Sequence, residues 1–202
     1  MRRLAIIGSA KSGGAAQIIE ALSSSLLYQP SLIFDRDFDL LPHGIFGVPV
    51  VGPVELLAEY WSLGEFEEAI IAIGGDLNER KRLFLHLQEL GIRLANVIDP
   101  NVKTGMNVSF GQGNVILNNS YFGNNVSLGD NNYILNQCSF QHDTKIADHN
   151  YFATNVTVGA KVKIGNGNRF GIKCIIETGG IVGDTKTLPS GKLLTSMGKD
   201  FI

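Results

Sequence analysis

The feature that most constrains the fold is a six-residue repeat in the second half of the chain. Stepping by six from Phe110 meets a large apolar residue at thirteen consecutive positions. In a chain that is 44% hydrophobic, such a run arises by chance with a probability of about 10⁻⁴ over the six possible frames. The positions are Phe110, Ile116, Phe122, Leu128, Ile134, Phe140, Ile146, Phe152, Val158, Ile164, Phe170, Ile176 and Val182. A hexapeptide repeat is the signature of a parallel β-helix, in which three hexads form one triangular coil and the coils stack.

The resulting 18-residue coil predicts which side chains stack inside the β-helix. The fifth position of each hexad should face inward, and asparagine recurs there at Asn114, Asn132, Asn150 and Asn168. We expect these residues to form an internal ladder, with each side-chain amide bonded to the coils above and below. The other two inward columns are Ser120, Cys138, Val156 and Cys174, and Val126, Thr144, Val162 and Gly180. Both cysteines are therefore predicted to be buried structural thiols.

The corners of the coil are also marked in the sequence. The residue after Phe110, Leu128, Ile146, Ile164 and Val182 is Gly, Gly, Ala, Gly and Gly, respectively. This pattern predicts one tight corner at the same height in every coil, where glycine tolerates a positive φ. Nothing interrupts the repeat between residues 110 and 187, so we expect no projecting loop.

The first 96 residues follow a different pattern, in which apolar strands alternate with helices. Strands are predicted over 3–8, 31–37 and 67–75, with an extended segment over 44–52, and helices over 15–27, 53–64 and 77–91. This alternation is typical of right-handed βαβ units and a parallel sheet. The predicted fold is an α/β N-terminal Rossmann-like domain over residues 1–96, followed by a β-helix domain over residues 97–202.

Composition excludes several classes of function. The net charge is −2 and the basic residues are spread along the chain, which argues against a nucleic-acid or membrane-surface binder. No apolar run is long enough for a membrane span or a signal peptide. The two cysteines are far apart and no cluster of metal ligands accompanies them. We therefore expect a cytoplasmic protein without a metal site.

His142 and Asp143 are the strongest candidates for chemistry. They occupy the third and fourth positions of their hexad, at a corner outside the core, and the residues one coil before and after His142 are Asn124 and Ala160. A carboxylate that accepts one ring N–H leaves the other imidazole nitrogen free to take a proton. The repeat alone leaves two interpretations open, a general base or a solvated surface histidine.

The first domain offers a second candidate site, where its predicted strands end. The turn over residues 8–14, "GSAKSGG", opens a helix and could bind phosphate through its backbone N–H groups, but it lacks the glycine spacing of an NAD fingerprint. Acidic and basic residues follow the second and third strands, at Asp35, Arg36, Asp37, Asp76 and Arg80. Each could contact a ligand, or could form a turn or, for Asp76, cap a helix.

Several segments together resemble a known family. "GVPVVG", "AIGGDLNERKR", "VIDPNV", "HDTKI" and "VGAKVKIGNGNRFGI" are similar to the bacterial sugar acyltransferases of the sialic-acid O-acetyltransferase (NeuD) and PglD type. The resemblance covers nearly the whole chain. It implies a left-handed β-helix, a homotrimer, and transfer of acetyl from acetyl-CoA to an amino or hydroxyl group of a sugar, often a nucleotide-linked 4-amino sugar. It also implies that His142 is the general base and Asp143 its orienting partner.

The resemblance extends to the binding residues. The nucleotide sugar is expected at Gly8, Ser9, Ser12, Gly13, Asp35, Arg36, Asp76 and Arg80. The backbone N–H of Ala160 is the candidate donor to the oxyanion, and acetyl-CoA is expected in a groove between adjacent β-helices, near Tyr151, Ala160, Gly171, Ile172 and Lys199. Three features depart from the family pattern: Ser12 and Tyr151 each replace a family histidine, and "SMGK" replaces the family's C-terminal motif.

The expected function is therefore acetyl-CoA-dependent N-acetylation of a nucleotide-linked amino sugar in surface-glycan biosynthesis. O-acetylation of a sugar such as sialic acid is an alternative within the same class. An alternative of another class is a non-catalytic trimer that binds a nucleotide sugar, since hexapeptide helices also serve as scaffolds.

Overall fold

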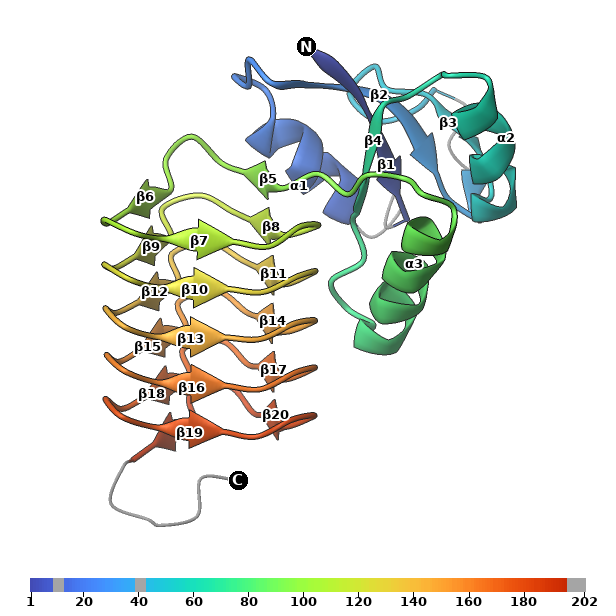
Figure 1. The fold of residues 1–202 in the computed structure, drawn as a ribbon. Helices are drawn as coiled ribbons and strands as arrows, with labels where there is room; N and C mark the ends of the chain where they lie inside the picture. Colours follow the sequence, from blue (N-terminus) through green and yellow to red (C-terminus); the bar gives the residue numbers. More distant parts are fainter. Residues whose placement is uncertain (9–12, 39–42, 196–202) are drawn as a thin grey trace. The chain divides into compact units, whose positions relative to one another are not determined.

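The structure is a computed structural model that describes residues 1–8, 13–38 and 43–195. The predicted site residues Ser9, Ser12 and Lys199 lie outside these ranges. The chain divides into two compact units, Met1–Pro100 and Asn101–Ile202, whereas the sequence placed the division after residue 96 (Figure 1).

The first unit contains a four-stranded parallel sheet in the order β3-β2-β1-β4. Its strands are β1 (Arg2–Ile7), β2 (Tyr28–Phe34), β3 (Val50–Gly52) and β4 (Glu68–Ile71), and the short β5 (Val97–Ile98) follows near its end. Its helices are α1 (Gly14–Ala21), α2 (Leu57–Ser62), which directly follows the 3₁₀ turn η2 (Val54–Leu56), and α3 (Leu77–Glu89). The predicted alternation of strands and helices in this half is confirmed.

Two of the predicted elements are shorter than expected. The helix predicted over 15–27 ends at Ala21, and Ser25 Oγ then accepts the backbone N–H groups of the second and third residues after it. Serine side chains favour such turns because they compete for the backbone groups that a helix needs. The extended segment predicted over 44–52 contributes only the three residues of β3.

The central strands of the first unit are buried, as expected for a parallel sheet. From Leu4 to Ile7 no side chain of β1 is exposed. The one charged side chain buried on β4, Glu68, accepts hydrogen bonds from Arg2 Nη1 and from the Tyr28 hydroxyl. Burial, and then the hydrogen bond from Tyr28 to Glu68, raise the pKa of Tyr28 to about 12.

The second unit is a parallel β-helix made of strands of two residues each (Figure 1). One sheet contains β7 (Ser109–Phe110), β10 (Ser127–Leu128), β13 (Lys145–Ile146), β16 (Lys163–Ile164) and β19 (Ile181–Val182). The second contains, within this unit, β8 (Val115–Ile116), β11 (Tyr133–Ile134), β14 (Tyr151–Phe152), β17 (Arg169–Phe170) and β20 (Thr187–Leu188). The third contains β6 (Lys103–Thr104), β9 (Tyr121–Phe122), β12 (Ser139–Phe140), β15 (Thr157–Val158), β18 (Ile175–Ile176) and β21 (Leu193–Leu194).

Each strand of the β-helix pairs in parallel with the strand one coil away. Phe122 pairs with Phe140, and Phe140 with Val158, so residues 18 apart are direct neighbours. The aromatic rings of Phe122 and Phe140 stack at 4.9 Å between centroids. The predicted six-residue period is confirmed, and the three stacked sheets fit the left-handed β-helix that the sequence suggested.

The predicted asparagine ladder runs through the interior of this unit. Asn132 Nδ2 donates to Asn114 Oδ1 at 3.2 Å, Asn150 Nδ2 to Asn132 Oδ1 at 3.1 Å, and Asn168 Nδ2 to Asn150 Oδ1 at 3.0 Å. The same oxygens accept the backbone N–H groups of the next rung. All four side chains are fully buried.

The two cysteines are buried in an inward column, as predicted. Cys138 and Cys174 lie two coils apart, and both thiols donate to backbone carbonyls, of Ala153 and Pro189 respectively. Burial raises the pKa of Cys138 to about 12 and also raises that of Cys174. Both groups are therefore protonated thiols near neutral pH, which favours the structural interpretation.

The prediction about the corners was wrong in its physical reason. Positive φ occurs at the fourth position of the hexads, for example at Asn125 (60°) and Asp143 (60°), and not at the glycines of the second position. Close approach of the next coil is the reason for glycine at Gly111, Gly129 and Gly165. A Cβ at Gly111 would lie 2.0 Å from Asp130 Oδ1 and 2.8 Å from the carbonyl carbon of Gly129.

We predict that Asn150→Leu destabilises the protein by about 3 kcal/mol or more, because it deprives Asn132 and Asn168 of buried hydrogen-bond partners at nearly constant side-chain volume. Denaturant unfolding followed by circular dichroism measures the change. Asn118→Ala, at a half-exposed corner position, should change stability by less than about 0.5 kcal/mol. Equal stability of the two variants would contradict a structural role for the ladder.

Candidate active site

His142 and Asp143 lie together at the corner that joins β12 to β13. The distance from His142 Nδ1 to Asp143 Oδ2 is 2.8 Å. An ionised carboxylate can only accept a hydrogen bond, so Nδ1 carries a proton, and in the neutral imidazole Nε2 keeps its lone pair. The two side chains are 54% and 43% exposed, so both are accessible to solvent. This arrangement can accept a proton from a bound nucleophile.

The Asp143 carboxylate is stabilised in its ionised form. His142 Nδ1 donates to one of its oxygens and Asn125 Nδ2 donates to the other at 2.9 Å. These hydrogen bonds, in that order, lower the pKa of Asp143, and the positive charge of Lys161 lowers it further. The carboxylate is therefore charged wherever the imidazole can act as a base.

Two backbone N–H groups near this corner depart from the hydrogen bonding seen at other third positions of the hexads. At the corner between β10 and β11, the N–H of Asp130 donates to the Asp148 carboxylate one coil later at 2.7 Å. The residue in the equivalent place relative to His142 is Ala160, which has no acceptor in its side chain. Within the described part of the chain, the backbone N–H groups of His142 and Ala160 donate no hydrogen bond. Both remain available to an oxygen atom of a ligand.

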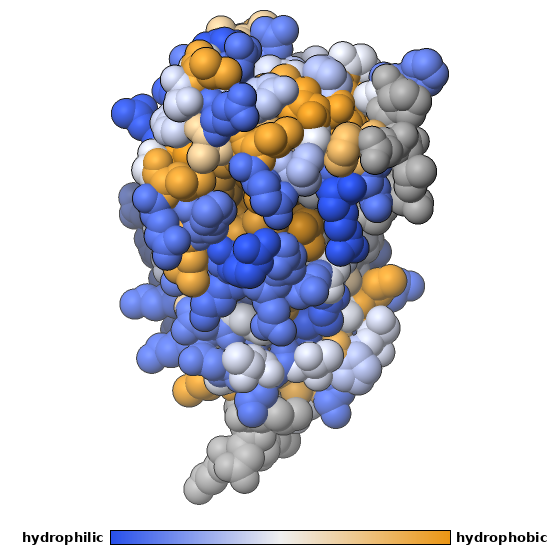
Figure 2. All heavy atoms as spheres, turned by 90° about the vertical axis from the view of Figure 1, so that its right-hand side faces the viewer, coloured by the Kyte–Doolittle hydropathy of each residue, from blue (hydrophilic) through white to orange (hydrophobic). Residues whose placement is uncertain are grey.

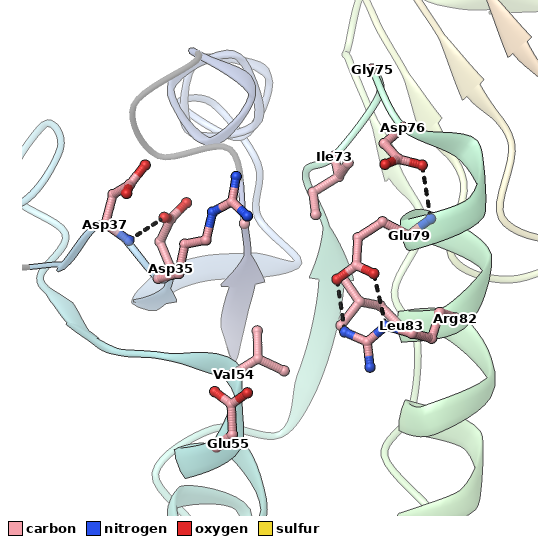
Figure 3. A pocket seen from close by; sticks show the side chains of 12 residues that line it. Asp35, Asp37, Val54, Glu55, Ile73, Gly75, Asp76, Glu79, Arg82 and Leu83 are labelled. Carbon is pink, nitrogen blue, oxygen red and sulfur yellow. Dashed lines mark hydrogen bonds and ion pairs between the residues drawn. The ribbon is translucent and has the colours of Figure 1, made fainter.

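The first unit contains a pocket of about 720 Å³ at the carboxyl ends of its strands (Figure 3). This volume is within the range of small-molecule sites. In Figure 3, Asp35, Asp37 and Glu55 face Ile73, Asp76 and Glu79 across it. The lining residues are Gly8, Asp35, Arg36, Asp37, Val54, Glu55, Ile73, Gly75, Asp76, Glu79, Arg82 and Leu83.

Local hydrogen bonds hold the carboxylates of this pocket. Asp35, which is buried at the end of β2, accepts the backbone N–H of Asp37 at 2.9 Å. Asp76 caps α3 by accepting the N–H of Glu79 at 3.0 Å, which confirms the predicted capping role and also leaves Asp76 on the pocket wall. Arg82 donates twice to Glu79 at 2.7 Å and thereby lowers the pKa of that carboxyl.

Glu79, Arg82 and Glu55 are pocket residues that were not predicted from the sequence. A signal for two of them was present, since "DLNER" is a capping pattern that places Glu79 in the first turn of α3. Arg82 follows on the same helical face three residues later.

Arg80 does not line the pocket, although the sequence suggested that it could reach a ligand. Its side chain is fully buried, and its Nη1 donates to the carbonyl oxygens of Ile71 and Ile73. This arginine therefore joins the first turn of α3 to the carboxyl end of β4. The structure gives it a structural role beneath the site.

The glycines of the first turn have separate roles. Gly8 has φ 77° and lines the pocket, and a Cβ there would lie 2.6 Å from Ile73 Cγ1. Gly13 has φ 91° and is the N-cap of α1. Arg36 is exposed and lines the pocket beside Asp35.

The residues expected to bind acetyl-CoA lie on different faces of the β-helix. Ala160 stacks directly above His142, at the same corner. Tyr151 projects from β14, where the Arg169 guanidinium lies 4.5 Å from its ring centroid. Gly171 and Ile172 form the corner between β17 and β18. One chain thus brings His142 and Ala160 together but does not bring Tyr151, Gly171 or Ile172 to them.

Within the described residues, no group of three or more His, Cys, Asp or Glu side chains could hold a metal ion. No helix in that part of the chain has the length and apolar character to cross a membrane.

Solved structures share the fold of this chain. A histidine-to-alanine mutant of GDP-perosamine N-acetyltransferase from Caulobacter crescentus, in complex with CoA and GDP-perosamine, superposes with a TM-score of 0.87 at 22% identity, over 95% of this chain and 88% of that one. The acetyltransferase domain of PglB from Neisseria gonorrhoeae gives a TM-score of 0.65 at 21% identity, over 97% and 94%. Neither a family model nor a curated protein matches the sequence.

We predict that Gly123→Ala disturbs the candidate base without touching its chemistry. A Cβ at Gly123 would lie 2.8 Å from the His142 backbone nitrogen, so the corner must shift. We expect a loss of about 1–3 kcal/mol in stability, together with reduced activity. Gly111→Ala is the matched control, because it overpacks another corner of the β-helix. Denaturant unfolding should show similar destabilisation of the two variants. The rate of the reaction that depends on His142 should fall only in Gly123→Ala.

Proposed function

We propose that this protein transfers acetyl from acetyl-CoA to an amino group of a nucleotide-linked sugar. The observation that carries the proposal is the exposed His142–Asp143 pair, joined through Nδ1 at 2.8 Å, with the backbone N–H of Ala160 at the same corner. The shared fold adds support, because the similar proteins are named as sugar N-acetyltransferases or acetyltransferase domains.

The chemistry follows from these groups. His142 Nε2 takes the proton of the sugar amine as the amine attacks the thioester carbonyl carbon, and Asp143 stabilises the resulting imidazolium. The N–H of Ala160 donates to the oxyanion of the tetrahedral intermediate. When the C–S bond breaks, the imidazolium returns the proton to the CoA thiolate, which leaves the amide and free CoA.

The pocket of the first unit is the proposed site of the nucleotide. The strand order β3-β2-β1-β4 is that of the first four strands of a doubly wound nucleotide-binding sheet, which supports the Rossmann-like assignment. The pocket carries five carboxylates, Asp35, Asp37, Glu55, Asp76 and Glu79, but only two guanidinium groups, Arg36 and Arg82. Such a lining favours the hydroxyl and N–H donors of ribose and base. The phosphates belong near Gly8 and Gly13, at the amino end of α1.

A homotrimer would complete the acetyl-CoA site. His142 and the corner at Gly171 and Ile172 lie at opposite edges of the sheet that contains β12, β15 and β18, so a second copy must bring the two corners together. Apolar side chains project from this same sheet, at Tyr121 (41% exposed), Ile175 (45%) and Leu193 (48%). By contrast, the lower part of the face drawn in Figure 2 is mostly hydrophilic. We infer a cytoplasmic trimer with acetyl-CoA bound between its β-helices.

We expect His142→Ala to lower the rate of acetyl transfer by at least about 100-fold, because the amine then lacks a base. A thiol-detection assay of released CoA measures the rate, and circular dichroism with analytical ultracentrifugation shows whether fold and assembly persist. Full activity in a folded His142→Ala protein would refute the assignment of the base.

The role of the pocket is tested by calorimetry with UDP-, dTDP- and GDP-linked 4-amino sugars, with and without CoA. One of these ligands should bind the wild-type protein, and Asp37→Asn should weaken that binding by about tenfold, since one charged acceptor is lost. CoA binding should be unchanged in Asp37→Asn. An unchanged affinity for the nucleotide sugar in Asp37→Asn would mean that the nucleotide binds elsewhere.

A further inference from the structure

A file of fourth-position residues runs along the corner that carries the base. Asn107, Asn125, Asp143 and Lys161 are spaced one coil apart and share a left-handed backbone, with φ between 56° and 60°. The N–H of each member from Asn125 onward donates to the carbonyl of the third-position residue of the previous coil, at 2.8–2.9 Å. These backbone bonds fix the direction in which each side chain leaves the corner.

The side chains of this file form a directed chain of hydrogen bonds that ends on the Asp143 carboxylate, which also accepts from the imidazole. Asn107 Nδ2 donates to Asn125 Oδ1 at 3.2 Å, and Asn125 Nδ2 donates to Asp143 Oδ1 at 2.9 Å. The polarity is forced: a carboxylate only accepts, so the Asn125 amide must present its NH₂ group to Asp143 and its oxygen to Asn107. Asp143 Oδ2 remains for His142 Nδ1.

We propose that Asn125 is a positioning residue for acetyl transfer, which holds the Asp143 carboxylate with Oδ2 on His142 Nδ1, and that Asn107 in turn orients the Asn125 amide. The inference rests on the proposed function of His142 as the base. Without Asn125, the exposed Asp143 side chain can rotate and release the imidazole, because only one of its two oxygens remains hydrogen-bonded to a side chain.

The electrostatic setting makes a neutral donor suitable at this place. Asp143 is followed one coil later by Lys161, whose charge also acts on the carboxylate, and it adjoins His142. Asn125 adds a hydrogen bond without adding charge, so the imidazolium formed during the reaction is stabilised by one carboxylate of fixed orientation. Changing Asn125 therefore alters both the rate and the pH at which the base becomes protonated.

Glycine and aspartate at position 125 test the proposal, because both accept a left-handed backbone. Asn125→Gly should lower kcat by about tenfold with little change in KM, since a loosely held base is misplaced for proton transfer. Asn107→Gly, one step further away, should lower it by about twofold. Thr185→Gly is the matched control, because Thr185 is exposed, has φ 58° and occupies the fourth position at the corner between β19 and β20; its kcat should equal that of the wild type.

The pH dependence separates orientation from general damage. Loosening Asp143 stabilises the imidazolium less, so in Asn125→Gly the acid limb of the kcat/KM profile should move down by about half a pH unit. Asn125→Asp adds a second carboxylate and should move it up by a similar amount. An acid limb that stays in place, or moves the same way in both variants, overturns the proposal, as does a wild-type kcat in Asn125→Gly.

A titration by NMR keeps this inference independent of the activity assay. The spectrum of His142→Ala assigns His142 among the four histidines of the chain. Relative to the wild type, the midpoint of its imidazole titration should lie at lower pH in Asn125→Gly and at higher pH in Asn125→Asp. If the wild-type protein transfers no acetyl group, the proposed function fails, yet the opposite shifts would still establish the positioning by Asn125; equal midpoints in all variants would refute it.

Discussion

The hydrogen bonding between coils that lie 18 residues apart is the interaction on which the rest of the second unit depends. Each strand is only two residues long, too short to be stable by itself, so its stability comes from the coils above and below. The ladder of Asn114, Asn132, Asn150 and Asn168 satisfies buried backbone groups in the same direction. A shift of register by one residue would place these amides outside and expose the apolar first positions, so register is strongly specified.

This register also builds the candidate site. Because each hexad from residue 104 to residue 193 has a left-handed residue at its fourth position, a side chain at one corner lies next to the fourth-position side chain of the next coil. Asp143 thereby receives the Asn125 amide from below, while its own neighbour His142 supplies the imidazole. Ala160 contributes by lacking a polar side chain, which leaves the backbone N–H of His142 without the acceptor that other third-position residues find one coil later. A regular scaffold thus becomes a site by two local departures from its pattern, an added histidine and a missing acceptor.

The first unit obeys different constraints. Its parallel strands end at one edge, where peptide groups and helix termini need partners, and the chain meets that need with Asp35, Asp76 and the buried Arg80. Asp76 could be recognised as a cap from the sequence because capping is a local interaction. The burial of Arg80 could not, because nothing local indicates that a guanidinium in a helix otherwise rich in charge will turn inward to the carbonyls of β4. The ion pair of Glu79 with Arg82 could be predicted in part, because the two residues lie on one helical face, but their position on the pocket wall could not.

The sequence by itself determined the repeat, the inward columns, the place of His142 at a corner and its neighbours Asn124 and Ala160, because a strict period converts separation along the chain into contact in space. Asn125 beneath Asp143 follows from the same period, but its hydrogen bond depends on side-chain direction. The tertiary structure decided that direction, the fourth-position site of positive φ, and the steric demand for glycine at particular second positions such as Gly111. All three depend on how closely adjacent coils approach, a distance that is set by the packing of the whole stack rather than by any one hexad.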